Sequence, residues 1–144
     1  MRPVTLRFAE NFVPECGTIA AHREIIDLIG HVWYDKLGSP ISNKTADEIL
    51  DDTDPRFLLI HSGGQGRWWV YVEKIQRETP PLEEIPAYYR DKADDFGCWF
   101  MVRSFEPAAK NVMSQCLVAS SGKLLASASR HSMSPYFIID YAAK

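Results

Sequence analysis

Residues 56–75, RFLLIHSGGQGRWWVYVEKI, constrain the fold more than any other stretch of the chain. An apolar run over residues 57–60 ends at His61-Ser62, a glycine-rich connection follows over residues 63–66, and residues 67–72 lead back. Two β-branched and aromatic runs that flank a short glycine-rich loop predict a β-hairpin, because glycine supplies the positive-φ positions of such turns.

The return strand of this hairpin carries aromatic residues on both faces. Side chains alternate along a strand, which gives two sets: Trp68, Val70 and Val72, and Trp69, Tyr71 and Glu73. A strand with one wet face rarely has this pattern. We therefore expect the hairpin to lie centrally in a small curled sheet or barrel.

The size and composition of the chain indicate one soluble domain over residues 1–144. Its hydrophobic share of 46% and charged share of 24% are ordinary for a globular protein. No apolar run approaches the roughly 18 residues of a spanning helix. The start of the chain lacks the apolar core of a secretory signal. The three cysteines, Cys16, Cys98 and Cys116, are odd in number and widely spaced. This pattern is more typical of reduced thiols than of a disulfide framework, so we expect a cytoplasmic protein.

The net charge and the absence of common enzyme motifs exclude several classes of function. A net charge of −3 argues against a protein that holds duplex DNA mainly by neutralising phosphates, but it is compatible with a narrow pocket for one base. The sequence has no P-loop, GxGxxG, GxSxG or HExxH pattern and no CxxC or HxxxH pair. We therefore predict no metal site and no cofactor, and an enzyme is the less favoured reading.

The remaining segments predict short strands and peripheral helices. Strands are expected over residues 4–8, 31–34, 98–102 and 136–139, with a weak hairpin over 117–126. Helices are expected over residues 19–29, with Thr18 and Gly30 as caps, and over residues 46–50, with Ser42 or Asn43 as N-cap. A helical turn is expected over residues 110–113. Residues 79–96 read as an inserted loop with a short helix from Pro86. This pattern predicts an α+β fold, a small mixed β-barrel of about six strands.

Three groups of residues are candidates for binding. His61 and Ser62 stand at a strand end and either reach a ligand or bond the backbone of their own turn. A set of aromatic residues offers rings for stacking a nucleobase, although any one of them is more often a core residue: Trp33, Tyr34, Trp68, Trp69, Tyr71 and Trp99. The serine-rich segment 129–135 contains Arg130 and His131 and is expected to be a loop. It either donates hydrogen bonds to a phosphate or base edge, or is a polar loop whose Arg130 pairs with an acid.

These residues resemble a known family. A strand ending in His61-Ser62, a glycine turn and an apolar strand followed by Glu73 are similar to the pattern of the EVE domain, within the wider PUA-like group that includes ASCH and YTH domains. The Arg-Leu-Ser-Val-x-Pro segment of that family has a counterpart here in residues 130–135, RHSMSP. The chain departs from the family at Ile60, where the family often has Tyr, and at the bulky residues 68–71.

The resemblance implies a pseudobarrel with a pocket that recognises a base in nucleic acid. We expect a non-catalytic domain whose ligand is DNA or RNA with a modified base, or a free nucleobase-like molecule. The expected ligand-binding residues are Trp33, Tyr34, His61, Ser62, Trp68, Trp69, Arg130, Ser132 and Ser134. Lys36 and Arg67 would contact the nucleic-acid backbone. The alternatives are an ASCH-like hydrolase acting on a nucleoside or RNA, and a protein-interaction module.

Overall fold

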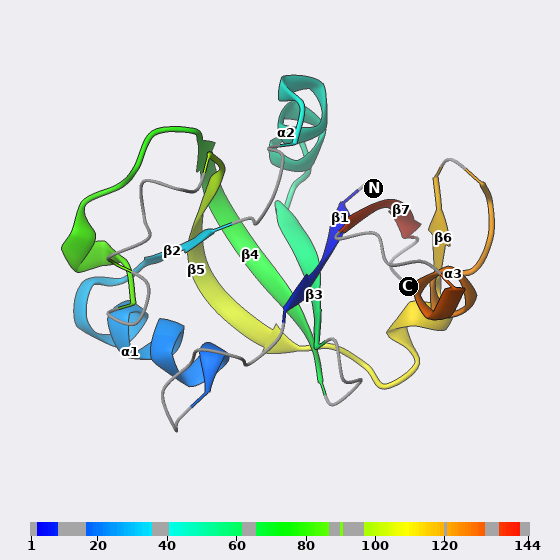
Figure 1. The fold of residues 1–144 in the computed structure, drawn as a ribbon, viewed down its shortest axis with the longest axis horizontal. Coiled ribbons are helices and arrows are strands. Elements are labelled where there is room, and N and C mark those ends of the chain that lie inside the picture. Colours follow the sequence, from blue (N-terminus) through cyan, green and yellow to red (C-terminus); the bar gives the residue numbers. More distant parts are fainter. Residues whose placement is uncertain are drawn as a thin grey trace.

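The computed structural model of the chain describes residues 3–8, 17–35, 41–61, 66–86, 90, 97–119, 121–131 and 136–141. Within these ranges, seven strands form one sheet and short helices lie around it (Figure 1). The predicted α+β class with peripheral helices is therefore confirmed.

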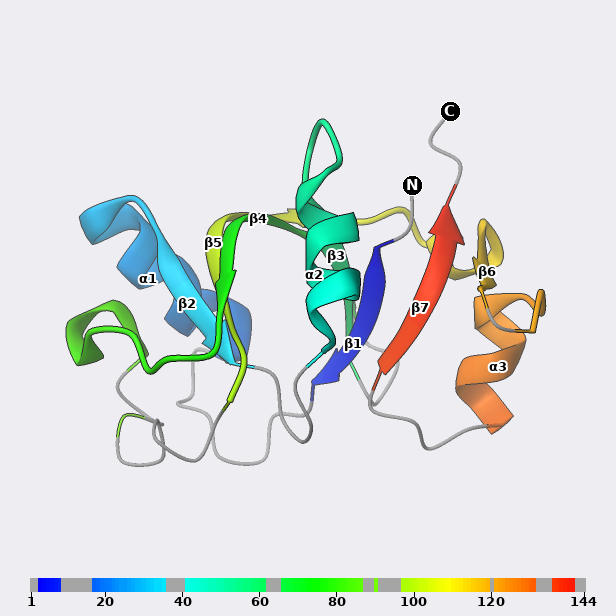
Figure 2. The ribbon, with the colours of Figure 1, turned by 90° about the horizontal axis from the view of Figure 1, so that it is seen from above.

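The sheet is mixed, with the strand order β2-β5-β4-β3-β1-β7-β6. Its strands are β1 Val4–Phe8, β2 Val32–Asp35, β3 Arg56–His61, β4 Arg67–Gln76, β5 Trp99–Pro107, β6 Cys116–Val118 and β7 Tyr136–Tyr141. Neighbours are antiparallel except for β1 and β3, which run parallel. Figures 1 and 2 show the sheet curving from β2 and β5 on one side to β7 and β6 on the other. No pairing joins β2 to β6 in the described part of the chain, so the barrel is open there.

The β3–β4 hairpin lies in the middle of this sheet, as predicted. Phe57, Leu58 and Leu59 are fully buried and Ile60 is 5% exposed, because both faces of β3 are covered. On β4, Val70 and Val72 belong to a first core, against which Trp68 packs. Trp69 belongs to a second core, against which Tyr71 packs. The predicted alternation of β4 is therefore confirmed, and each of its faces meets a separate core.

The first two helices follow the predicted spacing with small differences. α1 (Thr18–Ile29) ends at Gly30, whose φ of 90° is left-handed and whose N–H bonds Ile26 O, as predicted. Thr18 was the wrong N-cap, because the helix already includes it and Gly17 occupies the cap position. α2 (Asn43–Leu50) starts earlier than predicted, and its cap is the Ser42 hydroxyl, which accepts from Thr45 N at 3.1 Å.

The C-terminal third differs most from the prediction. Residues 117 and 124 form an isolated bridge, but the expected second strand is instead the start of α3 (Leu125–His131), which includes Ser129 and Arg130. Leu125 is fully buried in the second core and Ala128 packs against that core. The short apolar face of α3 therefore decides its conformation through tertiary packing, against the weak local preference of a serine-rich segment. The predicted turn near residue 112 is the 3₁₀ turn η3 (Val112–Ser114).

The inserted segment also begins differently. A 3₁₀ turn, η1 (Leu82–Glu84), precedes Pro86, where a helix was expected to start. The Glu84 carboxylate accepts from Trp33 Nε1 at 2.9 Å and contacts His31 Nε2, which fixes the turn against β2. Most of residues 87–96 lie outside the described part of the chain.

Candidate nucleic-acid interface

The strand register places the last residue of β3 and the first residue of β7 at one end of the sheet. Leu6 of β1 pairs with Leu59 of β3 on one side and with Tyr136, the first residue of β7, on the other. Two residues further along, Phe8 pairs with His61, the last residue of β3. Neighbouring strands are about 4.8 Å apart, so β3 and β7 are separated here by about 10 Å. The first residue of β7 therefore lies near the strand end that carries His61 (Figure 2).

Several predicted ligand residues fall outside what the structure describes. Ser62, Ser132, Ser134 and Lys36 lie outside the described residues. For His61 and Arg130 the backbone is described and the side chain is not. Arg67 is the first residue of β4 and pairs with Ile60, one register position from His61.

Trp68 is an aromatic residue at this end of the sheet whose side chain the structure describes. It pairs with Leu59 and is partly buried. The Arg23 guanidinium of α1 lies 5.1 Å from the centroid of the indole and donates from Nη2 to Phe105 O at 2.7 Å. A backbone carbonyl thus fixes Arg23 over Trp68, which holds a planar cation against the face of an aromatic ring. The helical spacing of α1 indicated only that Arg23 avoids the apolar stripe, and it gave no sign of this long-range contact.

The other predicted rings lie in different places. Trp33 is 3% exposed and packs with Ile85 and Trp99 in a third cluster. Tyr34 is 7% exposed in the first core, with ring centroids 5.3 Å from His22 and 5.7 Å from Phe57. Trp69 is 8% exposed in the second core, on the face of β4 opposite Trp68. Trp33, Trp68 and Trp69 thus belong to three separate clusters, and the described residues do not bring Trp33 together with either hairpin indole.

A second group of cationic and aromatic side chains lies on the Trp69 face of the sheet. The guanidinium carbon of Arg56 is 4.9 Å from the Trp69 ring centroid and 5.6 Å from the Tyr71 ring centroid. The guanidinium carbon of Arg103 is 4.9 Å from the Tyr71 centroid on the β5 side. No motif in the sequence pointed to Arg56 or Arg103. The local signal for Arg56 is its hairpin register opposite Tyr71, and Arg103 has none.

Comparison with protein families decides the class of the chain. A family model described as Pua-like matches residues 4–140. The chain belongs to the Pua-like family. Comparison with curated proteins and with solved structures gave no match. The PUA-like resemblance is therefore confirmed, and the narrower likeness to EVE domains stays a prediction.

One carboxylate of this Pua-like chain is held in a polar cluster at the edge of the sheet. Hydrogen bonds from His31 and then from Trp33 lower the pKa of Glu84 below its usual value of 4.5. The side chains of His31 and Glu84 are 27% and 20% exposed. Because the indole donor of Trp33 is used in this cluster, it anchors η1 to β2.

The described cysteines of the Pua-like chain do not resemble catalytic thiols. Cys98 and Cys116 are both buried. Burial raises the pKa of Cys116 to about 11, which keeps the thiol protonated and unreactive at neutral pH. Among the described residues, no three His, Cys, Asp or Glu side chains are grouped as metal ligands would be. No helix in that part of the chain is long and apolar enough to cross a membrane.

Proposed function

We propose that this Pua-like chain is a non-catalytic, cytoplasmic RNA-binding domain that recognises one base, modified or unmodified, at the end of the sheet where β3 ends and β7 begins. The observation that carries the proposal is the double pairing of Leu6, with Leu59 on one side and Tyr136 on the other. This pairing supports the proposal because β3 ends in His61 and β7 begins at Tyr136, one residue after the predicted binding segment 129–135.

The proposed division of roles follows from the chemistry of these residues. The Arg23 guanidinium lies over the Trp68 ring and offers its outer plane for stacking a base. His61, Ser62, Arg130, Ser132 and Ser134 would donate hydrogen bonds to the base edge or its phosphate. Lys36 and Arg67 would contact the flanking backbone. The buried Trp33, Tyr34 and Trp69 would support the fold around this site.

Such a site suits an acidic domain. With a net charge of −3, neutralisation of phosphates contributes little to affinity, so recognition has to come from one stacked and hydrogen-bonded base. Stacking of a base on an aromatic ring contributes about 1–3 kcal/mol by truncation. Two or three hydrogen bonds that involve a charged group add about 1.5–3 kcal/mol each when they are well formed.

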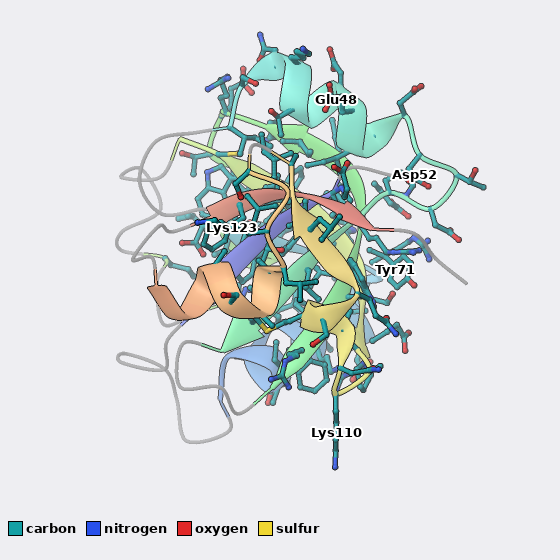
Figure 3. The ribbon with its side chains drawn as sticks, turned by 90° about the vertical axis from the view of Figure 1, so that its right-hand side faces the viewer. Glu48, Asp52, Tyr71, Lys110 and Lys123 are labelled. Atoms are coloured by element: carbon teal, nitrogen blue, oxygen red, sulfur yellow. The ribbon has the colours of Figure 1, made fainter. Side chains whose placement is uncertain are left out.

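The test is a titration of fluorescein-labelled RNA and DNA oligonucleotides that carry modified or unmodified bases, followed by anisotropy. We expect saturable binding that prefers one base, without any new product by chromatography. Arg130→Ala should weaken this binding about tenfold or more. Lys123→Ala removes the same charge from the exposed turn before α3 (Figure 3) and should leave affinity unchanged. Equal affinity of both variants, or turnover of the oligonucleotide, would reject the proposal.

A further inference from the structure

The face of the sheet opposite Trp68 carries a row of cationic and aromatic side chains that the proposed base site does not use. We call Arg56, Trp69, Tyr71 and Arg103 the arginine–tyrosine surface. Arg56 lies over the rings of Trp69 and Tyr71, and Arg103 lies over Tyr71 from the other side, at the distances given above. Tyr71 is thus flanked by two guanidinium groups, one from β3 and one from β5.

An irregularity in the sheet directs Arg103 to this surface. Tyr71 pairs with Ser104 and Val72 pairs with Val102, which leaves Arg103 as an extra residue between two successive pairs. Val102 and Phe105 both pack in the first core although three positions separate them, which strict alternation would forbid. A β-bulge of this kind redirects a side chain, and bulges are frequent next to functional sites. The bulge therefore places a guanidinium on the Tyr71 face while the first core stays intact.

The surface is accessible and its ion pair is weak. The side chains of Arg103 and Asp54 are 41% and 59% exposed, and their closest atoms, Nη2 and Oδ1, are 3.3 Å apart. An exposed pair of this kind contributes little to stability, so an incoming anion can replace Asp54 at low cost. Trp69 is 8% exposed and forms the floor, whereas Tyr71 is half-buried. Figure 3 shows Tyr71 on this side of the molecule, between Asp52 and Lys110.

We propose that the arginine–tyrosine surface binds one unpaired nucleotide of a single-stranded nucleic acid, separately from the base site at the strand end. The base stacks on the outer plane of the exposed Arg103 guanidinium, whose inner plane lies over the Tyr71 ring, and Arg103 exchanges the Asp54 carboxylate for a phosphate. Aromatic rings and arginine planes are the usual stacking partners of unpaired bases. Because adjacent residues of β4 face opposite sides, this contact and the Trp68 site act on different nucleotides.

The Asp54 carboxylate next to the surface predicts that removal of an ion pair will strengthen binding of nucleic acid. Asp54 competes with phosphate for Arg103, so Asp54→Asn should strengthen binding of a single strand severalfold. The local turn should survive this change, because Asp54 N donates to the Asp52 side chain and the Asp54 carboxylate takes no part in that bond. An ordinary loss of a structural ion pair would weaken or leave unchanged the binding of nucleic acid.

The experiment measures binding of the full chain to a fluorescein-labelled oligouridylate of twelve nucleotides by anisotropy, at two salt concentrations. Tyr71→Leu should weaken binding about tenfold, Tyr71→Phe should bind like the parent because the ring is kept, and Arg103→Lys should weaken binding severalfold although the charge is kept. Arg103→Gln should lower the slope of log affinity against log salt by about 0.7, the value for one phosphate contact on a single strand. Lys44→Gln, an equal charge change on exposed α2, is the matched control.

Each outcome supports or overturns the proposal. Equal affinities of Tyr71→Leu and Tyr71→Phe, or weaker binding by Asp54→Asn, would overturn it, as would failure of the parent chain to bind the oligouridylate. If Arg130→Ala loses base preference while Tyr71→Leu has no effect, the strand-end site stands and this surface does not. If polyglutamate displaces the oligonucleotide at lower concentration than unlabelled oligouridylate does, the surface recognises an acidic protein and the proposal is wrong. Tyr71→Phe and Arg103→Lys keep the packing, so misfolding of Tyr71→Leu would leave Arg103→Lys and Asp54→Asn to decide.

Discussion

Replacing Glu84 with alanine should destabilise the fold by about 1.5–4 kcal/mol at pH 7. The indole donor of Trp33, a residue only 3% exposed, would lose the carboxylate that accepts its hydrogen bond. Loss of an acceptor for a buried donor costs about 1–3 kcal/mol. The contact with His31 is partly exposed and adds about 0.5–1 kcal/mol. For a domain of this size the sum corresponds to a fall in Tm of roughly 4–15 °C.

The same carboxylate makes the stability depend on pH in a defined direction. The pKa of Glu84 is lower in the folded chain than its usual value of 4.5, so the unfolded chain takes up the proton first as the pH falls. Its contribution is therefore fully present above about pH 5 and is lost as the pH falls through the folded-state pKa. The difference in unfolding free energy between the parent chain and Glu84→Gln should shrink from pH 7 to pH 3. Glutamine keeps an acceptor for Trp33 and removes only the charge.

Urea unfolding followed by tryptophan fluorescence and circular dichroism at pH 7, 5, 4 and 3 measures these free energies. Glu83→Ala is the matched control, because Glu83 occupies the same 3₁₀ turn and is exposed. We expect Glu83→Ala to unfold within about 0.5 kcal/mol of the parent at every pH. Equal urea midpoints of Glu84→Ala and Glu83→Ala would contradict the role of this carboxylate. So would a loss of unfolding free energy in Glu84→Gln that is the same at pH 3 as at pH 7.

Substitutions at two helix caps and chemical labelling of one cysteine test the fold. Ser42→Ala removes the N-cap of α2 and should cost about 1 kcal/mol in urea unfolding, whereas Asn43→Ala should cost less. Gly30→Ala should cost about 1 kcal/mol in thermal unfolding because φ is 90° there, although the added Cβ meets nothing within 4 Å. Cys116 should react with a thiol reagent at pH 8 only after denaturant is added, since burial raises its pKa to about 11; rapid labelling of the native chain at this position would contradict the burial.

Local patterns predicted the elements whose conformation is set by neighbouring residues. The Gly30 cap and the Ser42 cap depend on short-range hydrogen bonds, and the alternation along β4 depends only on the strand period. The helical state of Arg130 could not be predicted in this way, because Leu125 and Ala128 hold α3 against a core formed by distant strands. Propensity is a weak guide where a short segment gains most of its stability from tertiary packing.

The candidate surfaces depend on contacts that no spacing in the sequence encodes. Arg23 reaches Trp68 only because α1 packs against β5, where Phe105 supplies the carbonyl that orients the guanidinium. Arg103 reaches Tyr71 through a bulge between two strands that are joined by a long insertion. Residue types predicted an aromatic and cationic binding domain. Apart from Arg56, which the hairpin register places opposite Tyr71, the cationic partner of each ring followed only from the tertiary structure.

The two indoles of β4 cannot set the register of that strand, because Trp68 and Trp69 are chemically equal and face opposite sides. The neighbours of these indoles set the register. A slip of one residue would exchange the faces of the whole strand and move Val70, which is fully buried, out of the first core. The same slip would carry Arg67 and Tyr71 into that core, where a guanidinium without a partner costs several kcal/mol. The alternation of Val70 with Arg67 and Tyr71 therefore fixes which indole belongs to the strand-end site and which to the arginine–tyrosine surface.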